Sequence, residues 1–295
     1  MSGYFKVLGI YREQQYSNHA FEADKLIMDE VLSSLIYYLG IKVSVTTIRP
    51  EDIAFKVLDF NYDLVLSMGQ DSNLLAYLDL LESRGAIVLN SSQAVRNCFR
   101  RKLSELLLDP VFSYPKFISL KVDKTTFDLK ESQFGFWVKR GDFHAIHDHD
   151  VVHINSIEEL TGVLKKFNDR GVEDVILQEG VEGELFKFYG VKDQFLDLRY
   201  LGRTSKNRYF NPPGNPSVYF DRNHLEKMVN KAADVLGLDF FGGDFIVSDD
   251  EKIHLIDFND WPSFRTCRNK VAPIMAMYAL SKLKNEVESD YSFIQ

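Results

Sequence analysis

The stretch GGDFIVSDDEKIHLIDFNDWPSF, residues 242–264, carries the strongest structural pattern in the sequence. Two apolar strands flank a turn at 248–251, which predicts an antiparallel hairpin. Strand alternation places Asp257 and Asn259 on one face, and Asp244 lies on the partner strand. Mg²⁺ prefers such oxygen donors, keeps several waters and takes further ligands from phosphate. A half-exposed strand with a polar face is the alternative interpretation.

Upstream of this hairpin, strands and helices alternate in the first third of the chain. Strands are predicted at 6–10, 42–48, 62–68 and 86–89, and helices at 21–39 and 73–83. The alternation predicts right-handed crossovers and a parallel sheet. Such sheets bind ligands at the carboxyl ends of their strands, where Tyr11, Arg12 and Gln70 are candidate substrate contacts.

The remainder of the chain predicts antiparallel sheets carrying helices. A helix is expected from Ser91 through Leu108, with further helices at 158–169 and 222–236 and at the C-terminus. Strands are expected around 115–120, 134–139 and 175–178, with hairpins at 185–200 and 244–259. The predicted fold class is α+β: an N-terminal doubly wound parallel α/β lobe followed by two antiparallel-sheet-plus-helix lobes. The expected domains are 1–92, 93–177 and 178–295.

Composition narrows the classes of function. The 295 residues carry a formal net charge of -8, which argues against a broad nucleic-acid surface. Basic residues are instead clustered locally, which favours a small phosphorylated ligand, with solvated helix faces as the alternative. No apolar run is long enough for a membrane helix, and the N-terminus has no pattern of a secretory leader, so a cytoplasmic protein is expected. Cys98 and Cys267 indicate neither a disulfide framework nor a zinc site.

With Pro262 following IDFN, the hairpin resembles the metal-binding hairpin of ATP-grasp enzymes. In that superfamily an acidic residue and a D/E-x-N pair hold one or two magnesium ions. The resemblance implies that Asp244, Asp257 and Asn259 bind Mg²⁺, with Mn²⁺ as an alternative. It covers most of the chain and is of the carboxylate–amine ligase type, similar to the glutathione synthetase and glutamate ligase branch.

Three further segments are similar to the nucleotide site of that superfamily. The segment FWVKRGDFHA, 136–145, resembles the strand and mobile loop that contact phosphate, which implies nucleotide-binding roles for Lys139 and His144. Lys102 matches the first phosphate lysine, with Arg101 as the alternative. The segment VILQEGVEGE, 175–184, resembles the adenine hinge. It implies that Gln178, Glu179 and Val181 line the nucleotide and that Glu184 holds the ribose.

The loop after Lys139, RGDFHAIHDHD, departs from the glycine- and serine-rich loop common in the superfamily. Its phosphate contacts are therefore an open question. Its histidines, with His153 beyond them, also allow a zinc site as an alternative, although their spacing matches no closed zinc motif.

Lys187 and Arg199 lie on consecutive strands of a predicted hairpin, where both are candidate catalytic residues facing a transferring phosphate. The segment FKFY around Lys187 also resembles the inositol trisphosphate 5/6-kinase branch, in which this lysine contacts the inositol phosphate. Arg265, Arg268 and Lys270 are candidates for clamping an anionic acceptor in either case.

These resemblances imply an ATP- and Mg²⁺-dependent ligase. It would activate a carboxylate as an acyl phosphate for attack by an amine and release ADP and phosphate. The alternatives are a small-molecule kinase of the inositol-phosphate type and a non-catalytic nucleotide-binding regulatory protein. The expected partners are ATP and an anionic small-molecule or peptide acceptor, without nucleic acid or membrane. A homodimer is a further expectation, since dimers are frequent among relatives.

Overall fold

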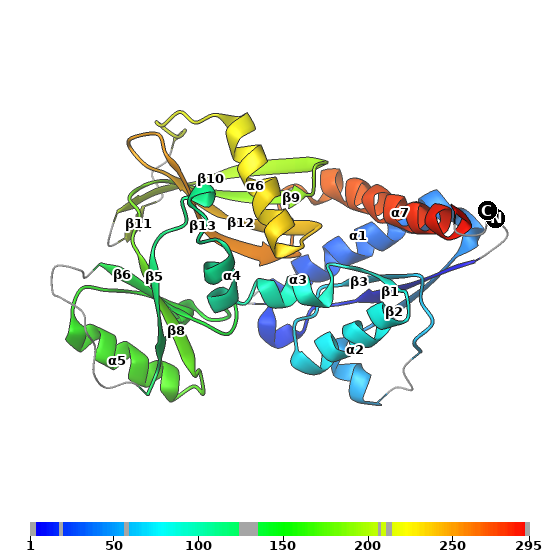
Figure 1. The fold of residues 1–295 in the computed structure, drawn as a ribbon, viewed down its shortest axis with the longest axis horizontal. Helices are drawn as coiled ribbons and strands as arrows, with labels where there is room; N and C mark the ends of the chain where they lie inside the picture. The colour runs from blue at the N-terminus through cyan, green and yellow to red at the C-terminus, as the bar shows by residue number, and fades with distance from the viewer. Residues whose placement is uncertain are drawn as a thin grey trace.

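A computed structural model describes residues 4–17, 20–55, 59–123, 135–205, 208–210 and 214–292. The chain forms three β-sheets, each carrying helices (Figure 1). One sheet is parallel and two are antiparallel, which confirms the predicted α+β class. Within the described residues, no helix is both long enough and apolar enough to cross a membrane.

The first sheet is parallel, with strand order β2-β1-β3-β4. Its strands are β1 (Phe5–Ile10), β2 (Val43–Ile48), β3 (Leu64–Ser67) and β4 (Ile87–Leu89). Alternate residues of β1 belong to two cores: Val7 packs with α1 (Phe21–Leu39), and Leu8 packs with α2 (Ser72–Ser83). The sheet therefore has helices on both faces, as the doubly wound pattern predicts. Short 3₁₀ helices lie at Gln14–Tyr16, Gly40–Lys42 and Pro50–Phe55.

The helix predicted from Ser91 through Leu108 is wrong in its continuity. The structure has two helices, α3 (Ser92–Asn97) and α4 (Arg100–Leu106), followed by a 3₁₀ turn at Pro110–Phe112. Phe99 between the helices has extended backbone angles, and its ring packs 4.8 Å from the ring of Phe143. This tertiary contact accompanies a break that local helix propensity does not reveal.

The second sheet is antiparallel, with strand order β5-β8-β6-β7. Its strands are β5 (Phe117–Lys121), β6 (Phe136–Arg140), β7 (Val151–Ile154) and β8 (Asp174–Glu179). Helix α5 (Ile157–Asn168) covers one face through Leu160, Leu164 and Phe167. Strand β7 was not predicted, because its short apolar run follows a polar loop that ends in a 3₁₀ turn at Asp148–Asp150.

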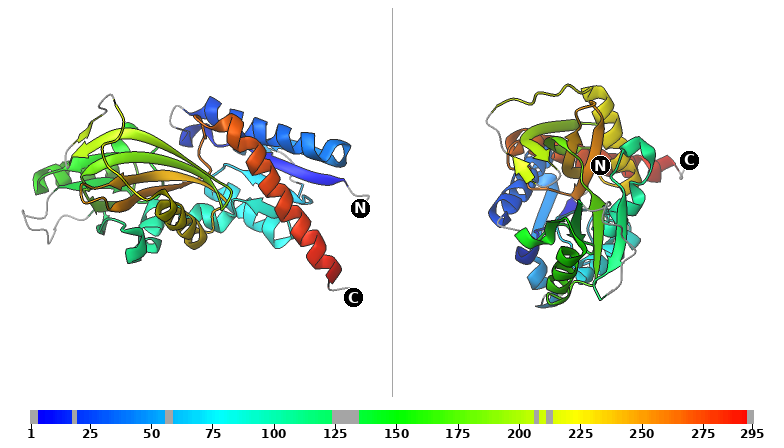
Figure 2. Two further views of the ribbon diagram at one scale, coloured as in Figure 1. Left: turned by 90° about the horizontal axis from the view of Figure 1, so that it is seen from above. Right: turned by 90° about the vertical axis from the view of Figure 1, so that its left-hand side faces the viewer.

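The third sheet is antiparallel, with order β11-β10-β9-β12-β13. Its strands are β9 (Gly183–Val191), β10 (Phe195–Ser205), β11 (Arg208–Phe210), β12 (Phe240–Val247) and β13 (Ile253–Asp260). Helix α6 (Arg222–Leu236) packs on one face over a group of phenylalanines. The last helix, α7 (Arg268–Ser292), leaves this sheet, packs against α1 of the first lobe and crosses it at an angle (Figure 2).

Polar side chains at the carboxyl ends of the first sheet hold the β12–β13 hairpin. Asn90 Oδ1 accepts from the backbone amides of Asp239 and Phe240, at 2.8 and 2.9 Å. Arg12 donates to the carbonyl of Trp261 at 2.5 Å. Gln70 Nε2 donates to Asp260 Oδ1 at 2.7 Å. The β12–β13 hairpin is therefore fixed against the edge at which parallel sheets bind ligands.

Candidate active site

Four charged residues form one row across the third sheet. Arg199 is opposite Lys187, Lys187 is opposite Asp244, and Asp244 is opposite Asp257. Directly opposed residues project from the same face of a sheet, so the four share a surface. Asn259 follows two positions after Asp257 and lies on the same face. The register thus brings both predicted catalytic residues and all three predicted metal ligands to one side of the sheet.

A cavity of about 330 Å³ lies over part of this row. Its lining includes the predicted residues His144, Lys187, Asp244, Asp257 and Asn259. The first lobe supplies Arg12, Tyr16, Asp24 and Gln70 to the same lining. A larger cavity of about 710 Å³ lies beside Glu13, Glu51 and Asp71 and includes none of the predicted site residues. The chemistry of the side chains therefore favours the smaller cavity as the candidate site.

The two carboxylates of the row have basic neighbours. Lys187 Nζ lies 3.1 Å from Asp244 Oδ1, and Asp244 raises the pKa of Lys187. Burial alone would raise the pKa of Asp257, but the positive charges of Arg100, Lys139 and Lys187 lower it overall. Both acids thus lie in a cationic environment that keeps Asp257 ionised.

Lys139 ends inside the protein, close to the β13 strand. Its Nζ lies 3.5 Å from the carbonyl oxygen of Ile256, and its side chain is buried. Burial, reinforced by the charge of Arg100, lowers the pKa of Lys139 to about 8. The flexible stem of a lysine brings a point charge into a closed space, which suits contact with a phosphate group.

Arg100 is the functional candidate that the sequence interpretation missed. It is only 2% exposed, and its Nη2 lies 3.4 Å from Asp257 Oδ2. Lys102, predicted to contact phosphate, is about half exposed and lies 3.8 Å from Glu105. The structure therefore does not bring Lys102 to the cavity. A helical-wheel signal was present in the sequence, because Arg100 shares the buried face of Leu103 and Leu107 at spacings of three and seven.

A narrow second cavity, about 20 Å³, lies between the second and third sheets. Lys139 and the predicted hinge residues Gln178, Glu179 and Val181 line it, together with Trp137, Thr204, Ile246 and Ile256. Gln178 is 2% exposed, and its Nε2 has no hydrogen-bond partner among the described residues. A buried donor without a partner is costly unless a ligand acceptor completes it. The hinge segment thus has one buried side-chain donor that a ligand could use.

Neither Glu184 nor Arg199 lines this narrow cavity. The buried Glu184 carboxylate accepts from Tyr200 Oη and, at 2.9 Å, from Ser217 Oγ. Tyr200 packs against Phe186 on the face of the third sheet that α6 covers, and Glu184 does not line the narrow cavity. Arg199 is about half exposed and donates to the carbonyl of Thr266 at 3.1 Å.

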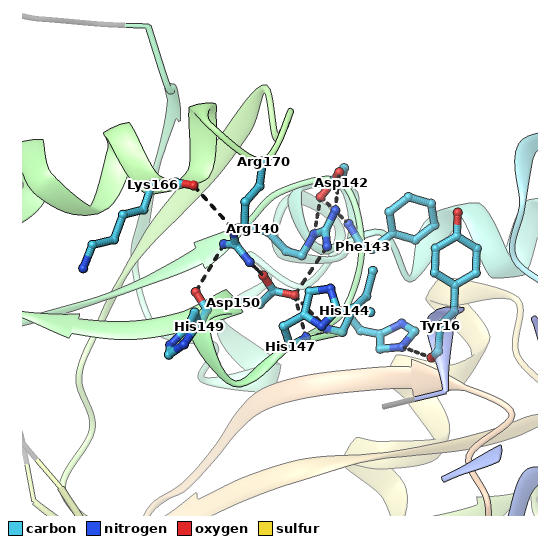
Figure 3. Close-up of polar contacts among 11 residues, drawn as sticks. Tyr16, Arg140, Asp142, Phe143, His144, His147, His149, Asp150, Lys166 and Arg170 are labelled. Carbon is cyan, nitrogen blue, oxygen red and sulfur yellow. Dashed lines mark hydrogen bonds and ion pairs between the residues drawn. The ribbon is translucent and has the colours of Figure 1, made fainter. Parts of the chain in front are cut away.

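The loop after Lys139 is built around one carboxylate (Figure 3). Asp150 is fully buried and accepts from the amides of Ile146 and His147 at 2.8 and 2.9 Å. Arg170 Nη1 lies 2.7 Å and Arg140 Nη1 3.4 Å from the same carboxylate. The contacts give a definite shape to a loop that has one glycine, Gly141, and no serine.

This loop also contacts the first lobe. The ring of Phe143 stacks on Tyr16 with centroids 4.9 Å apart, and His144 Nε2 lies 3.4 Å from the carbonyl oxygen of Tyr16. Burial lowers the pKa of His144 to about 4, and Arg12 and Arg100 reinforce the shift, so the imidazole is neutral at pH 7. His144 therefore offers the cavity a polar ring without adding charge.

The metal-binding expectation can be tested against the donors present. In the described part of the chain, no three His, Cys, Asp or Glu side chains are grouped to hold a metal ion. The predicted set has two carboxylates and the amide of Asn259. Asp244 Oδ1 makes no well-aligned hydrogen bond. This donor set fits Mg²⁺, which completes its shell with water and nucleotide phosphate, and it does not fit an all-protein zinc site.

No protein-family model and no curated protein matches the sequence. Solved structures match the fold over nearly the whole chain. The D-alanine–D-alanine ligase from Bacillus anthracis complexed with ATP has a TM-score of 0.70 at 12% identity, covering 97% of this chain and 99% of that one. D-alanyl-alanine synthetase A from Vibrio cholerae has a TM-score of 0.65 at 12% identity, covering 97% and 99%. ATP-grasp ligase PsnB, complexed with precursor peptide PsnA2 and AMPPNP, has a TM-score of 0.64 at 13% identity, covering 96% and 99%. The chain therefore has the ATP-grasp fold.

Proposed function

We propose that the protein is an ATP- and Mg²⁺-dependent ligase that joins a carboxylate to an amine and releases ADP and phosphate. The observation that carries this proposal is that consecutive residues of β13 line the two cavities: Ile256 lines the narrow one, and Asp257 lines the one of about 330 Å³. Lys139 also lines the narrow hinge cavity. The negative charge of Asp257 favours the charged form of Lys139. A nucleotide with its base at the hinge would extend its phosphates past Lys139 toward the charged row.

On this proposal the side chains have separate roles. The Glu179–Val181 backbone and the Gln178 amide would hold adenine, and Lys139 and Arg100 would hold phosphate oxygens. Asp244, Asp257 and Asn259 would hold Mg²⁺, which when bound neutralises charge on the terminal phosphates. Lys187 would stabilise the negative charge that develops as the acceptor attacks. Arg199 would orient an anionic group at the open end of the row.

The cavity of about 330 Å³ would hold the acceptor, and its size favours a small substrate. Its volume of about 330 Å³ lies at the lower end of small-molecule sites. Proteins with the same fold include D-alanine–D-alanine ligases and a ligase bound to a precursor peptide. We propose an amino acid or the end of a peptide side chain as the group whose carboxylate is activated. Three expectations stay predictions: domain boundaries after residues 92 and 177, a homodimer, and a cytoplasmic location.

The chemistry can be tested by trapping the activated carboxylate. Enzyme, ATP, Mg²⁺ and a pool of amino acids and short peptides are incubated with hydroxylamine, and mass spectrometry identifies the products. We expect a hydroxamate together with ADP, because the site would place the γ-phosphate toward the acceptor. A stable phosphorylated alcohol would show a kinase instead. AMP as the nucleotide product would overturn both enzymatic assignments.

A further inference from the structure

Two carboxylates face each other in the charged row of the third sheet. Asp244 and Asp257 are directly opposite in the register of β12 and β13, and both side chains are partly buried. Like charges in this arrangement destabilise a sheet. Each acid has one cation beside it. Lys187 Nζ lies 3.1 Å from Asp244 Oδ1, and the buried Arg100 extends its Nη2 to 3.4 Å from the other carboxylate, so the formal charges of these side chains cancel.

Both ion pairs are looser than others in this chain. Charge-assisted hydrogen bonds from nitrogen to a carboxylate oxygen usually span about 2.7–2.9 Å. Arg140 and Arg170 each lie 2.7 Å from a carboxylate oxygen. The contact of Arg100 is longer, and Asp244 Oδ1 makes no well-aligned hydrogen bond although Lys187 lies beside it. The two cations of the row therefore balance charge without saturating the carboxylates.

The same two cations are able to serve another anion. Arg100 Nε is buried and has no hydrogen-bond partner among the described residues. An unmet buried donor is costly, so an anionic ligand oxygen near Arg100 would compete well with Asp257 for the guanidinium. Lys187 lines the cavity of about 330 Å³, and its flexible stem allows the ammonium group to move from Asp244 to an anion in that cavity.

From these contacts we infer that Arg100 and Lys187 are built-in counter-ions of the proposed metal-binding carboxylates, which oppose binding of a divalent cation until nucleotide phosphates draw them away. The inference rests on the proposed ligase function and adds to it a control on metal binding. A divalent cation alone would give the row an excess of positive charge. Nucleotide and Mg²⁺ together supply the anionic oxygens that both counter-ions need, so each should strongly favour binding of the other.

The inference predicts that removing one positive charge beside the carboxylates strengthens metal binding. Mn²⁺ is titrated into the protein without nucleotide, and the electron paramagnetic resonance signal of unbound Mn²⁺ gives the dissociation constant. We expect Lys187→Met and Arg100→Gln each to bind Mn²⁺ at least about tenfold more tightly than the wild type. Arg100 is buried and Lys187 is partly exposed, so Lys187→Met keeps the test decisive if the other variant does not fold.

Two controls separate direct pairing from a general effect of charge. Arg199 belongs to the same row, but its guanidinium lies near Asp197 and the carbonyl of Thr266. Because Arg199 is about half exposed and screened by solvent, Arg199→Met should change the Mn²⁺ affinity less than about threefold. Adding Asp244→Asn to Lys187→Met should cancel the gain, since the carboxylate beside the lysine then carries no charge.

The outcomes separate the counter-ions from the ligase reaction. The counter-ion role is overturned if either folded variant, Lys187→Met or Arg100→Gln, binds Mn²⁺ no more tightly than the wild type, or if Arg199→Met gains as much. Hydroxamate formation by the wild type reports on the ligase reaction alone. Tighter Mn²⁺ binding in the variants, with no hydroxamate from the wild type, would support the counter-ions and reject the reaction. Hydroxamate from the wild type, with unchanged Mn²⁺ affinity in the variants, would do the reverse.

Discussion

At the scale of single residues, Lys139 is a side chain whose protonation a bound ligand would change. Its pKa is lowered to about 8 by burial and by Arg100, so its charged form is disfavoured in the free protein. Nucleotide phosphates would favour the charged form and raise this pKa again. Near and above pH 8, binding of ATP should therefore be coupled to uptake of a proton.

We expect ATP affinity to decrease as the pH rises above about 8, by up to tenfold per unit. Below pH 8 Lys139 is already protonated in the free protein, so the affinity should there be nearly independent of this group. Calorimetry in two buffers of different ionisation enthalpy would measure the proton uptake directly. Lys139→Arg keeps its charge throughout and should flatten the pH dependence; a wild-type slope in that variant would contradict the assignment.

Asp257 is the carboxylate on which the metal assignment depends most. Asp257→Asn removes the charge but keeps the shape, and should lower Mg²⁺-dependent turnover by roughly 100-fold with little change in fold. Steady-state kinetics against Mg²⁺ concentration would measure this. Asp250→Asn, at the exposed turn of the same hairpin, is the matched control. Full magnesium-dependent activity in both Asp257→Asn and Asn259→Ala would place the metal elsewhere.

Strand alternation correctly predicted which side chains of the hairpin share a face. Asp257 and Asn259 were predicted to share a face, and the register of β12 and β13 places them so. Arg100 was missed because matching by motif selected Lys102, while burial followed the helical period of Leu103 and Leu107. Gln70 and Arg12 were predicted as ligand contacts from the strand ends, and both line the cavity of about 330 Å³. Their bonds to the β12–β13 hairpin join residues 190 and 249 positions apart, which no local pattern reveals.

At the scale of elements, the loop between β6 and β7 differs most from expectation. The sequence predicted only its departure from a glycine- and serine-rich loop. Asp150 organises the actual loop, with backbone amides and two arginines around one carboxylate (Figure 3). Burial would raise the pKa of Asp150, but these donors lower it overall. Asp150 thus stabilises the fold above the pKa of an unfolded aspartate, and this contribution is lost as the pH falls through its lowered value.

We expect Asp150→Asn to lower the free energy of unfolding by about 2 kcal/mol at pH 7, because Arg140 and Arg170 lose their shared charge partner. The difference from the wild type should narrow at acidic pH, where the native carboxylate is protonated as well. Urea unfolding at several pH values measures both effects. Asp142→Asn, which changes a half-exposed partner of Arg140, should cost less; an equal cost would show that burial of Asp150 is not decisive.

At the scale of the whole molecule, the first lobe shares one of its two cores with the rest of the chain. One shared core includes Val7 and Leu64 of the first sheet, Phe240 and Trp261 of the third, and Met275 of α7. The sequence predicted a final helix but not its position, because the partner face on α1 lies more than 200 residues earlier. Contact between α7 and α1 brings the first and the last α-helix of the described chain together.

This shared core predicts that the first and third sheets unfold together. Ala276 on α7 is fully buried, and Ala276→Asp would place an unpaired carboxylate in the core, costing several kcal/mol. If the lobes are coupled through this core, the variant should lower the melting temperature of the entire first lobe and third sheet in a single transition. Trp261 is fully buried between them, so its fluorescence should change together with the far-ultraviolet circular dichroism.

Met277→Asp, at an exposed position of the same helix, is the control and should leave the transition nearly unchanged. Two separated transitions in calorimetry, with only one moved by Ala276→Asp, would show that the third sheet is stable without the first lobe.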